Sequence, residues 1–165
     1  MRTVADWIAR LQLAHHPEGG YYRETYRSTE RIPANGLPVR FQGERPVATA
    51  IYYLLPAGEV SVLHRLKSDE LWHFYDGGAL HLHLFGPDGN YHTLSLSGDV
   101  PQAVVSAGNW FGAELAAGAP YALVGCTVAP GFDFRDFELA SRAALLARHP
   151  EHPTVIERLT KAPAE

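Results

Sequence analysis

The residues best suited to chemistry lie in the segment from Gly58 to Gly77. Five residues separate Gly58 from His64, and five more separate His64 from Glu70. A histidine titrates near neutral pH, and a carboxylate can hold its ring in one tautomer or contact a ligand itself. We therefore predict that His64 and Glu70 are the catalytic pair of a small-molecule site.

Two adjacent strands are needed to position this pair. Alternation along the first strand places Val60, Val62 and His64 on one face. A hairpin then returns Glu70 on the second strand, where both polar groups can face the interior of a barrel and bind a ligand or a metal. The alternative is a buried His–Glu hydrogen bond within the core, but burying charge is costly, which favours a ligand.

Six more side chains are candidates for binding the ligand because they are aromatic or donate hydrogen bonds. Tyrosine offers a stacking surface and a hydroxyl, which suit sugars and bases, and arginine binds phosphate or carboxylate. An edge strand at a dimer interface is enriched in the same residue types, and core packing accounts equally well for several of the aromatic residues. The candidates are Tyr22, Arg23, Tyr53, Trp72, His73 and Trp110.

The strand predicted over residues 21–28 carries its tyrosines and arginines on opposite faces. Tyr22 and Tyr26 share one face of a regular strand. Arg23 and Arg27 share the other face. A ligand in the barrel would therefore contact only one of these two sets.

The remaining histidines have weaker claims to a role. His73 follows Glu70 at an odd interval, so in a regular strand the two point to opposite faces. His81 and His83 alternate with leucines that are expected to face the core, so we expect these histidines at the surface or at an interface. No role is assigned to the histidines of turns, strand ends and tails, which are His15, His16, His92, His149 and His152.

Lys67 and Cys126 carry two further reactive groups. Lys67 lies in the turn between the motif strands and is expected to serve that turn, with a position at the cavity rim as the alternative. Cys126 is the single cysteine, so an intrachain disulfide is impossible, and we expect it to be buried in a late strand.

From residue 48 onward, short strand-like segments follow one another with turn residues between them. No helix lies between them to make parallel crossovers, so a sandwich or barrel is expected. The predicted strands cover 21–28, 48–55, 60–65, 70–75, 80–85, 91–97, 103–105, 110–115 and 121–128.

Short helices are expected at both ends of this all-β domain, which we predict to span residues 1–165. Thr3 is a candidate N-cap for an amphipathic helix that ends near Leu11. A long surface loop is expected over 29–46. At the other end, a helix is predicted near 138–148 and a last helical turn over 154–159.

The composition limits the classes of partner. The 165 residues carry a net charge of −4, which argues against the basic face that nucleic-acid binding requires. Charges interrupt the first twelve residues, and no apolar run approaches the ~20 residues of a membrane span. We therefore expect a cytoplasmic protein with a small-molecule partner, and neither a nucleic-acid nor a membrane partner.

The segment from Gly58 to Gly77 resembles the first motif of the cupin superfamily, in which a glycine, two histidines one residue apart, a glutamate and a closing glycine recur. Leu66 stands where metal-binding cupins carry the second histidine. Phe111 stands where the second motif carries the last histidine. A catalytic metal usually has at least three protein ligands, so we predict no metal or other cofactor unless His73 or His83 completes a set.

Longer stretches are similar to the cupin-5 family, a group without an established activity. The resemblance implies a jelly-roll barrel, or double-stranded β-helix, and a homodimer. By shape, it also relates the chain to nucleotide-sugar epimerases and to germin and seed-storage cupins. The similar stretches are 13–28, 51–55, 64–75, 125–132 and 137–140.

Two classes of function follow from these residues. The first is a metal-independent epimerase or isomerase for a sugar or nucleotide-linked sugar. In it, His64 removes a proton next to a carbonyl and is held by Glu70 or another carboxylate, and Tyr22 or Tyr53 returns a proton. The second is a non-catalytic module that binds a polar or phosphorylated ligand such as a nucleotide, and a metal-dependent cupin enzyme is third. Resemblance in fold does not carry function.

Overall fold

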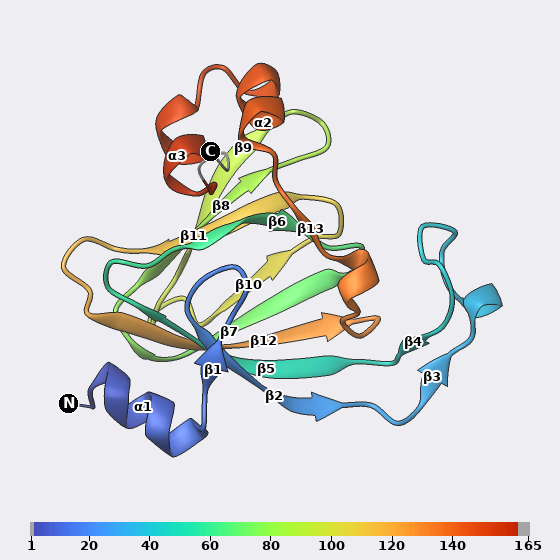
Figure 1. Cartoon of the computed structure of the whole chain (residues 1–165), viewed down its shortest axis with the longest axis horizontal. Helices are drawn as coiled ribbons and strands as arrows, with labels where there is room; N and C mark the ends of the chain where they lie inside the picture. The colour runs from blue at the N-terminus through green and yellow to red at the C-terminus, as the bar shows by residue number, and fades with distance from the viewer. Residues whose placement is uncertain (1, 162–165) are drawn as a thin grey trace.

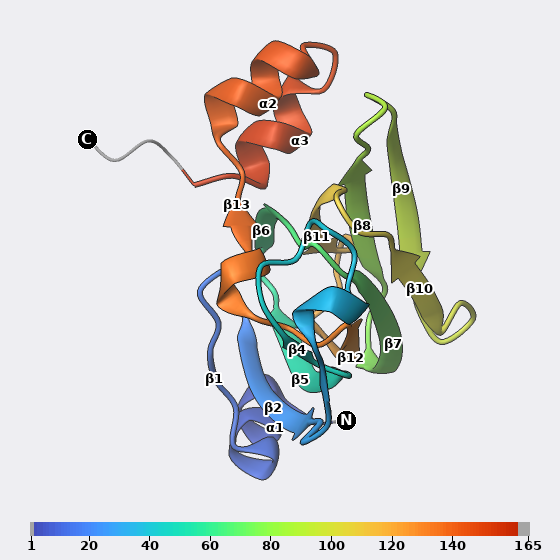
Figure 2. The same ribbon diagram turned by 90° about the vertical axis from the view of Figure 1, so that its right-hand side faces the viewer.

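The computed structural model describes residues 2–161, and two antiparallel β-sheets packed face to face form its centre (Figures 1 and 2). One sheet has the order β1 (Ala14–His15), β2 (Tyr21–Arg27), β5 (Thr49–Pro56), β12 (Tyr121–Ala129), β7 (Asp69–Gly77) and β10 (Gln102–Val105). The other has the order β13 (Glu138–Leu139), β6 (Ser61–Arg65), β11 (Trp110–Leu115), β8 (Leu80–Phe85) and β9 (Tyr91–Leu96). The predicted all-β architecture is confirmed.

The core lies between the two sheets and follows the alternation of the strands. Leu80, Leu82 and Leu84 are almost completely buried in it, as predicted, and the intervening His81 and His83 point to the other face of β8. Since one face of each strand is apolar, the sheets can bury that face only against each other. Most predicted strand boundaries agree with the structure to within two residues.

The predicted loop over 29–46 is partly ordered by short strands. β3 (Arg31–Ile32) pairs with β4 (Arg45–Pro46), and a 3₁₀ turn, η1 (Ala34–Gly36), lies between them. The Arg45 side chain is fully buried and binds both carboxylate oxygens of Asp136, at 2.6 and 2.7 Å. Asp136 belongs to a second 3₁₀ turn, η2 (Phe134–Asp136), so this ion pair fastens the projecting segment to the chain that follows β12.

At the N-terminus, α1 (Val4–Leu11) packs on the outer face of the six-stranded sheet. Thr3 is its N-cap, as predicted, and forms a reciprocal capping box with Asp6. Trp7 buries its ring against a cluster that includes Leu54 and Leu123. The prediction of a short amphipathic helix is therefore confirmed.

The C-terminal helices are shorter than predicted. Residues 138–139 form β13, which pairs with β6, so α2 (Arg142–Arg148) begins four residues later than the helix predicted from 138. α3 (Pro153–Arg158) follows it, and both helices cover the outer face of the five-stranded sheet (Figure 1). Backbone pairing with β6 outweighed helix propensity at the start of this segment.

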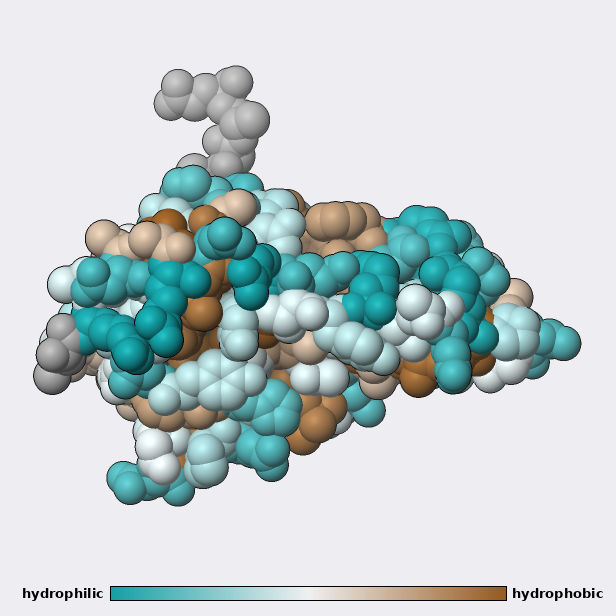
Figure 3. Space-filling model, turned by 90° about the horizontal axis from the view of Figure 1, so that it is seen from below, coloured by the Kyte–Doolittle hydropathy of each residue, from teal (hydrophilic) through white to brown (hydrophobic). Residues whose placement is uncertain are grey.

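The surface of the described residues combines polar and apolar side chains. None of the helices within residues 2–161 has the length and hydropathy needed to cross a bilayer. On the face shown in Figure 3, hydrophobic residues lie in separate patches among hydrophilic ones.

Candidate functional site

A cavity of about 280 Å³ lies between the sheets and opens beside η2. Strands β2, β5, β6, β7 and β12 line it, together with the turn that precedes β2 and the segment that follows β12. Its titratable lining side chains are His16, Glu18, Tyr22, Glu24, Arg27, Tyr53, His64, Glu70 and Cys126. The other lining residues are Thr49 and a set of apolar side chains that includes Phe132, Phe134 and Phe137. Phe134 is well exposed, which places it at the mouth.

His64 forms a close pair with Glu18 inside this cavity. The Nε2 atom of His64 lies 3.1 Å from Oε2 of Glu18, and its Nδ1 atom lies 2.7 Å from the carbonyl oxygen of Val62. A carbonyl can only accept, so we infer that Nδ1 carries a proton. A second proton must then lie between Nε2 and Oε2, because an unprotonated nitrogen and a carboxylate would repel each other.

Burial acts on both members of this pair in opposite directions. It lowers the pKa of His64 and raises the pKa of Glu18, because each loses the hydration of its charged form. Ser61 donates a hydrogen bond of 2.9 Å to the other oxygen of Glu18. The result is a hydrogen-bonded unit that shares one proton and has no net charge in either arrangement of that proton.

A bulge in β6 brings Ser61 and His64 to the same face. His64 pairs with Phe111 and Ser61 pairs with Ala113, so three residue steps on β6 match two on β11. The regular alternation that predicted Val60 and Val62 beside His64 is therefore wrong here.

The turn that carries Glu18 is packed tightly against two strands. Gly19 and Gly20 both have positive φ angles, and a Cβ atom on Gly19 would collide with the carbonyl oxygen of Val60. The hydroxyl of Tyr53 donates a 2.8 Å hydrogen bond to the Gly19 carbonyl. Only glycine permits this conformation and this approach, so the two glycines fix the position of Glu18.

His16, in the same turn, also lines the cavity. The backbone N–H of Glu18 donates to its Nδ1 atom at 3.2 Å, so we infer that His16 is neutral with its proton on Nε2. Burial lowers the pKa of His16, which agrees with this assignment. No role was predicted for His16, because a residue in a turn has no strand face that could be assigned to the cavity.

Glu70 is the least satisfied polar group of the cavity. Its Oε2 atom is buried and has no hydrogen-bond partner within residues 2–161. Burial raises the pKa of Glu70 to about 7, although the nearby His64 opposes the shift. A buried carboxyl oxygen without a partner is unfavourable, so Glu70 has unused hydrogen-bonding capacity beside the cavity.

A second bulge brings Arg27 of β2 to the cavity in place of Tyr26. The pairing of β2 with β5 shifts between Glu24 and Tyr26, so Arg27 joins Glu24 in the lining and Tyr26 is exposed. Arg23, a predicted ligand-binding residue, lies outside the cavity and donates to the side-chain oxygen of Gln12 at 3.3 Å.

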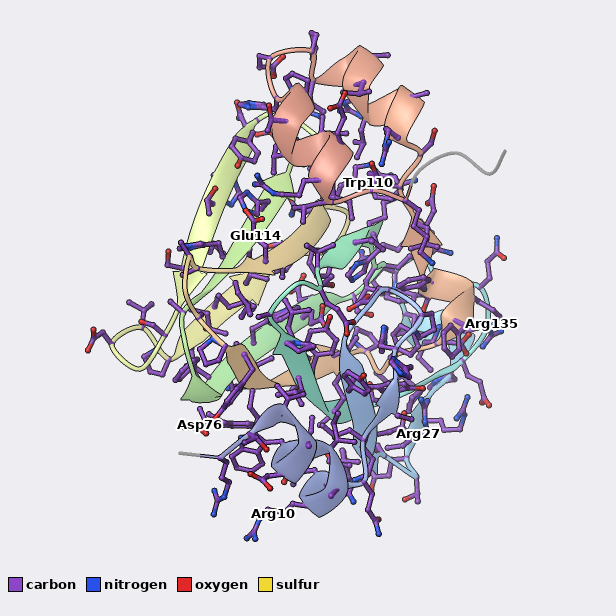
Figure 4. All side chains as sticks on the ribbon, turned by 60° about the vertical axis from the view of Figure 1, so that its left-hand side comes forward. Arg10, Arg27, Asp76, Trp110, Glu114 and Arg135 are labelled. Carbon is purple, nitrogen blue, oxygen red and sulfur yellow. The ribbon has the colours of Figure 1, made fainter. Side chains whose placement is uncertain are left out.

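The other predicted ligand-binding residues divide between the cavity and its surroundings. Tyr22 and Tyr53 line the cavity. Trp72 is buried in the core behind it, with its ring 5.9 Å from that of Tyr53. The remaining two residues lie elsewhere: His73 contacts Gln102 on the outer face, and Trp110 packs near α2 and α3, away from Arg27 (Figure 4).

Comparison with known proteins identifies the family. The family model described as Cupin superfamily (DUF985), the cupin-5 group, matches residues 5–140. The chain is a member of this cupin family. The predicted resemblance is therefore confirmed.

Three relatives illustrate the breadth of the family. The crystal structure of protein SO0799 from Shewanella oneidensis is 40% identical, with a TM-score of 0.85 over 98% of this chain and 99% of that one. A hypothetical protein from Leishmania major is 36% identical, with a TM-score of 0.87 over 98% and 100% of the two chains. The uncharacterized protein YML079W of Saccharomyces cerevisiae is 31% identical over 82% of this chain and 72% of its own length.

More distant structures share only the fold. A cupin 2 domain-containing protein and several oxalate decarboxylases are 13–14% identical to this cupin, with TM-scores of 0.53–0.59. These matches confirm the predicted cupin fold.

The metal that many cupins hold does not fit the residues of this cavity. Leu66 lines the cavity at one expected ligand position, and Phe111 packs its ring 4.2 Å from that of His64 at another. Within residues 2–161, no group of three or more His, Cys, Asp or Glu side chains is arranged to hold a metal ion. His73 and His83, which could have completed a set, do not line the cavity.

Proposed function

We propose that this cupin binds a small, uncharged polyhydroxy or carbonyl compound in its cavity and moves protons on it in an isomerase- or epimerase-like reaction. A volume of about 280 Å³ lies at the lower end of the range for ligand cavities, which suits a single sugar-sized group. The observation that carries the proposal is the unpartnered Glu70, which lines the same cavity as the proton-sharing pair of His64 and Glu18.

The charge of the cavity favours an uncharged group. The pair of His64 and Glu18 is neutral overall, and Arg27 is occupied by Glu24, with contacts of 3.0 and 2.7 Å. Glu70 adds a partial negative charge near pH 7, because its pKa is about 7. An anionic group in the cavity would therefore meet no unpaired cation among these residues and would be repelled by Glu70.

A proton-transfer sequence follows from these assignments. Ionised Glu70 removes a proton from a carbon next to a carbonyl, and the electron pair of that C–H bond forms the enol double bond. The pair of His64 and Glu18 gives its shared proton to the carbonyl oxygen. Glu70 then gives its proton to the former carbonyl carbon, while the hydroxyl on the neighbouring carbon gives its proton to the pair of His64 and Glu18 and becomes the new carbonyl. This completes an isomerisation, and each group regains its first protonation state.

These proton transfers give His64 and the tyrosines other roles than those predicted from the amino-acid sequence. His64 acts with Glu18 rather than as a free base, because its Nε2 atom already contacts Glu18. Tyr53 is a poor proton donor, because burial raises its pKa well above 10 and its hydroxyl is bonded to Gly19. Tyr22 remains available for contact with the ligand.

The test is a thermal-shift screen with neutral aldoses and ketoses, sugar phosphates and nucleotide sugars, on the wild type and Glu70→Gln. We expect a stabilising compound whose effect is lost in Glu70→Gln. Proton NMR of that compound in D₂O should then show exchange of a carbon-bound hydrogen. Binding without exchange would replace the reaction by simple ligand binding. Equal stabilisation of both proteins by every compound would refute the assignment of the site.

A further inference from the structure

A second hollow lies directly beside the cavity and shares a wall with it. It has a volume of about 670 Å³, and Leu66 and Phe137 line both spaces. We call it the Arg40–Lys67 groove, after two of its lining residues. Arg135, which Figure 4 shows on the same side of the molecule as Arg27, lies in its lining as well.

Unlike the cavity, the groove is lined by cationic side chains that are not fully paired with carboxylates. Arg40 forms no salt bridge within residues 2–161, and of its nitrogens only Nε has a hydrogen-bond partner there, the carbonyl oxygen of Lys67 at 2.8 Å. The ammonium of Lys67 lies 3.7 Å from Asp136, whose two oxygens already accept from Arg45. Both cations are therefore only weakly compensated.

The other two cations of the groove are held by neighbouring carboxylates. Arg65 contacts Glu138 at 2.7 Å, and Arg135 binds Asp133 through two nitrogens. The lining also holds Asp69, whose carboxylate opposes an anion and accepts from the backbone N–H of Ala107 at 2.8 Å. The cations left for an incoming anion are Arg40 and Lys67. Neither is buried, so their charges attract an anion without a large desolvation cost.

We propose that the Arg40–Lys67 groove binds a phosphate or diphosphate group. A guanidinium fork with free terminal nitrogens matches phosphate oxygens, and a lysine ammonium adds a flexible charge. The groove floor is open at Gly108, where a Cβ atom would meet no atom within 4 Å.

The groove lies beside the cavity, so it narrows the class of ligand for the proposed function. This identification of the ligand rests on that proposed function. The cavity suits an uncharged group, and Leu66 and Phe137 line both spaces, so an anion in the groove would lie beside that group. The ligand class is therefore a sugar-like compound that carries a phosphate or diphosphate, with its reacting end in the cavity and its anion in the groove.

The experiment is calorimetric titration of the full chain with inorganic pyrophosphate at low salt. We expect binding to the wild type, and weakening by at least ~10-fold in the double variant Arg40→Ala and Lys67→Ala, since each lost charged contact costs on the order of 1 kcal/mol or more. Arg10→Ala is the matched control, an exposed arginine on α1 at a different part of the surface (Figure 4), and should bind within about twofold of the wild type.

Two outcomes would overturn the groove: no binding of pyrophosphate to the wild type, or equal binding by the double variant with its circular dichroism unchanged. Glu70→Gln separates this proposal from the preceding one, because it lies in the cavity and should leave pyrophosphate binding intact. If pyrophosphate binds in the groove and no neutral sugar depends on Glu70, the groove stands and the proposed reaction fails. If a neutral sugar depends on Glu70 and pyrophosphate does not bind in the groove, only the proposal about the groove fails.

Discussion

The two faces of the five-stranded sheet each carry a histidine that pairs with a glutamate at nearly the same distance, and the surroundings of the two pairs differ. His64 lies 3.1 Å from Glu18 in the cavity, and His83 lies 3.0 Å from Glu114 on the outer face of the five-stranded sheet. Glu114 also binds Arg158 of α3 at 2.6 Å. The other ring nitrogen of His83 bonds to the hydroxyl of Tyr91 at 2.7 Å.

The comparison shows that the distance within such a pair does not indicate its role. His83 and Glu114 both have partners on further elements, and the pair does not line the cavity, so it acts as a link between α3 and the sheet. Beside His64 and Glu18 lie the unpartnered carboxyl oxygen of Glu70 and the empty space of the cavity. Spare hydrogen-bonding capacity next to a cavity is what marks the second kind of pair.

The largest expected difference between the pairs is in catalysis. His64→Ala removes the shared proton, and we expect hydrogen exchange on the compound found by screening to slow by at least ~100-fold. His83→Ala should leave the exchange rate within about twofold and lower the free energy of unfolding by about 1–3 kcal/mol, because the half-buried Tyr91 and Glu114 each lose a hydrogen-bond partner. NMR exchange rates and urea unfolding measure the two effects. Loss of exchange in both variants would contradict the division of roles.

The next effect is a pH dependence that belongs to the cavity alone. Because Glu70 has a pKa of about 7 in the folded chain and an ordinary value of 4.5, the folded state binds more protons between these values. Its contribution to stability is therefore complete below pH 4.5 and is lost as the pH rises through 7. The total loss is about 3 kcal/mol.

Glu70→Gln removes this titration. Urea unfolding at pH 5 and pH 8 should show that the wild type loses about 3 kcal/mol more than Glu70→Gln over this interval. His83→Ala should keep the wild-type dependence on Glu70, which makes it the control. Parallel behaviour of the wild type and Glu70→Gln would show that Glu70 titrates normally.

The smallest expected effect concerns the two hydroxyl groups that hydrogen-bond to the pairs, those of Ser61 and Tyr91. Ser61→Ala removes the hydrogen bond to Glu18, and Tyr91→Phe removes the one to His83 together with an exposed one from the Thr93 hydroxyl. Each variant should cost about 1 kcal/mol of unfolding free energy. Only Ser61→Ala should also change the pH profile of hydrogen exchange, because the Ser61 hydroxyl lowers the pKa of Glu18. An unchanged profile would reduce Ser61 to a structural role.

The fold was predictable because its determinants are local. Turn residues and the alternation of apolar side chains mark most strands, and the leucines of β8 face the core as the pattern indicates. The start of α2 was predicted too early because residues 138–139 pair with β6, a contact between segments about 74 residues apart that no local pattern reveals.

The site was only half predictable from the sequence. His64 and Glu70 were predicted from motif spacing, and Tyr22 and Tyr53 from the chemistry of tyrosine; all four line the cavity. Glu18 was missed because it lies in a turn and meets His64 only in the folded chain. The Gly19-Gly20 pair after Glu18 was the one available signal, since adjacent glycines permit a close approach of the backbone.

Bulges account for the errors on the strands. A single extra residue in β2 brings Arg27 to the cavity in place of Tyr26, and another in β6 places Ser61 beside His64. Because the side-chain period of a strand is two, one inserted residue reverses every later assignment. The bulge in β2 contains no glycine or proline, and the bulge in β6 lies opposite Gly112 of β11, where a Cβ atom would collide with the carbonyl oxygen of Ser61.

The position of β12 has a consequence for how the protein is made. β12 lies between β5 and β7 in the sheet, although it follows both in the chain by more than forty residues. A chain still on the ribosome can form the β6–β7 turn and the β8–β9 hairpin, but the six-stranded sheet has no centre until residue 129 has emerged. The cavity is therefore among the last parts of the protein to exist during synthesis, and a chain cut short before Tyr121 leaves two unpaired strand edges exposed to aggregation.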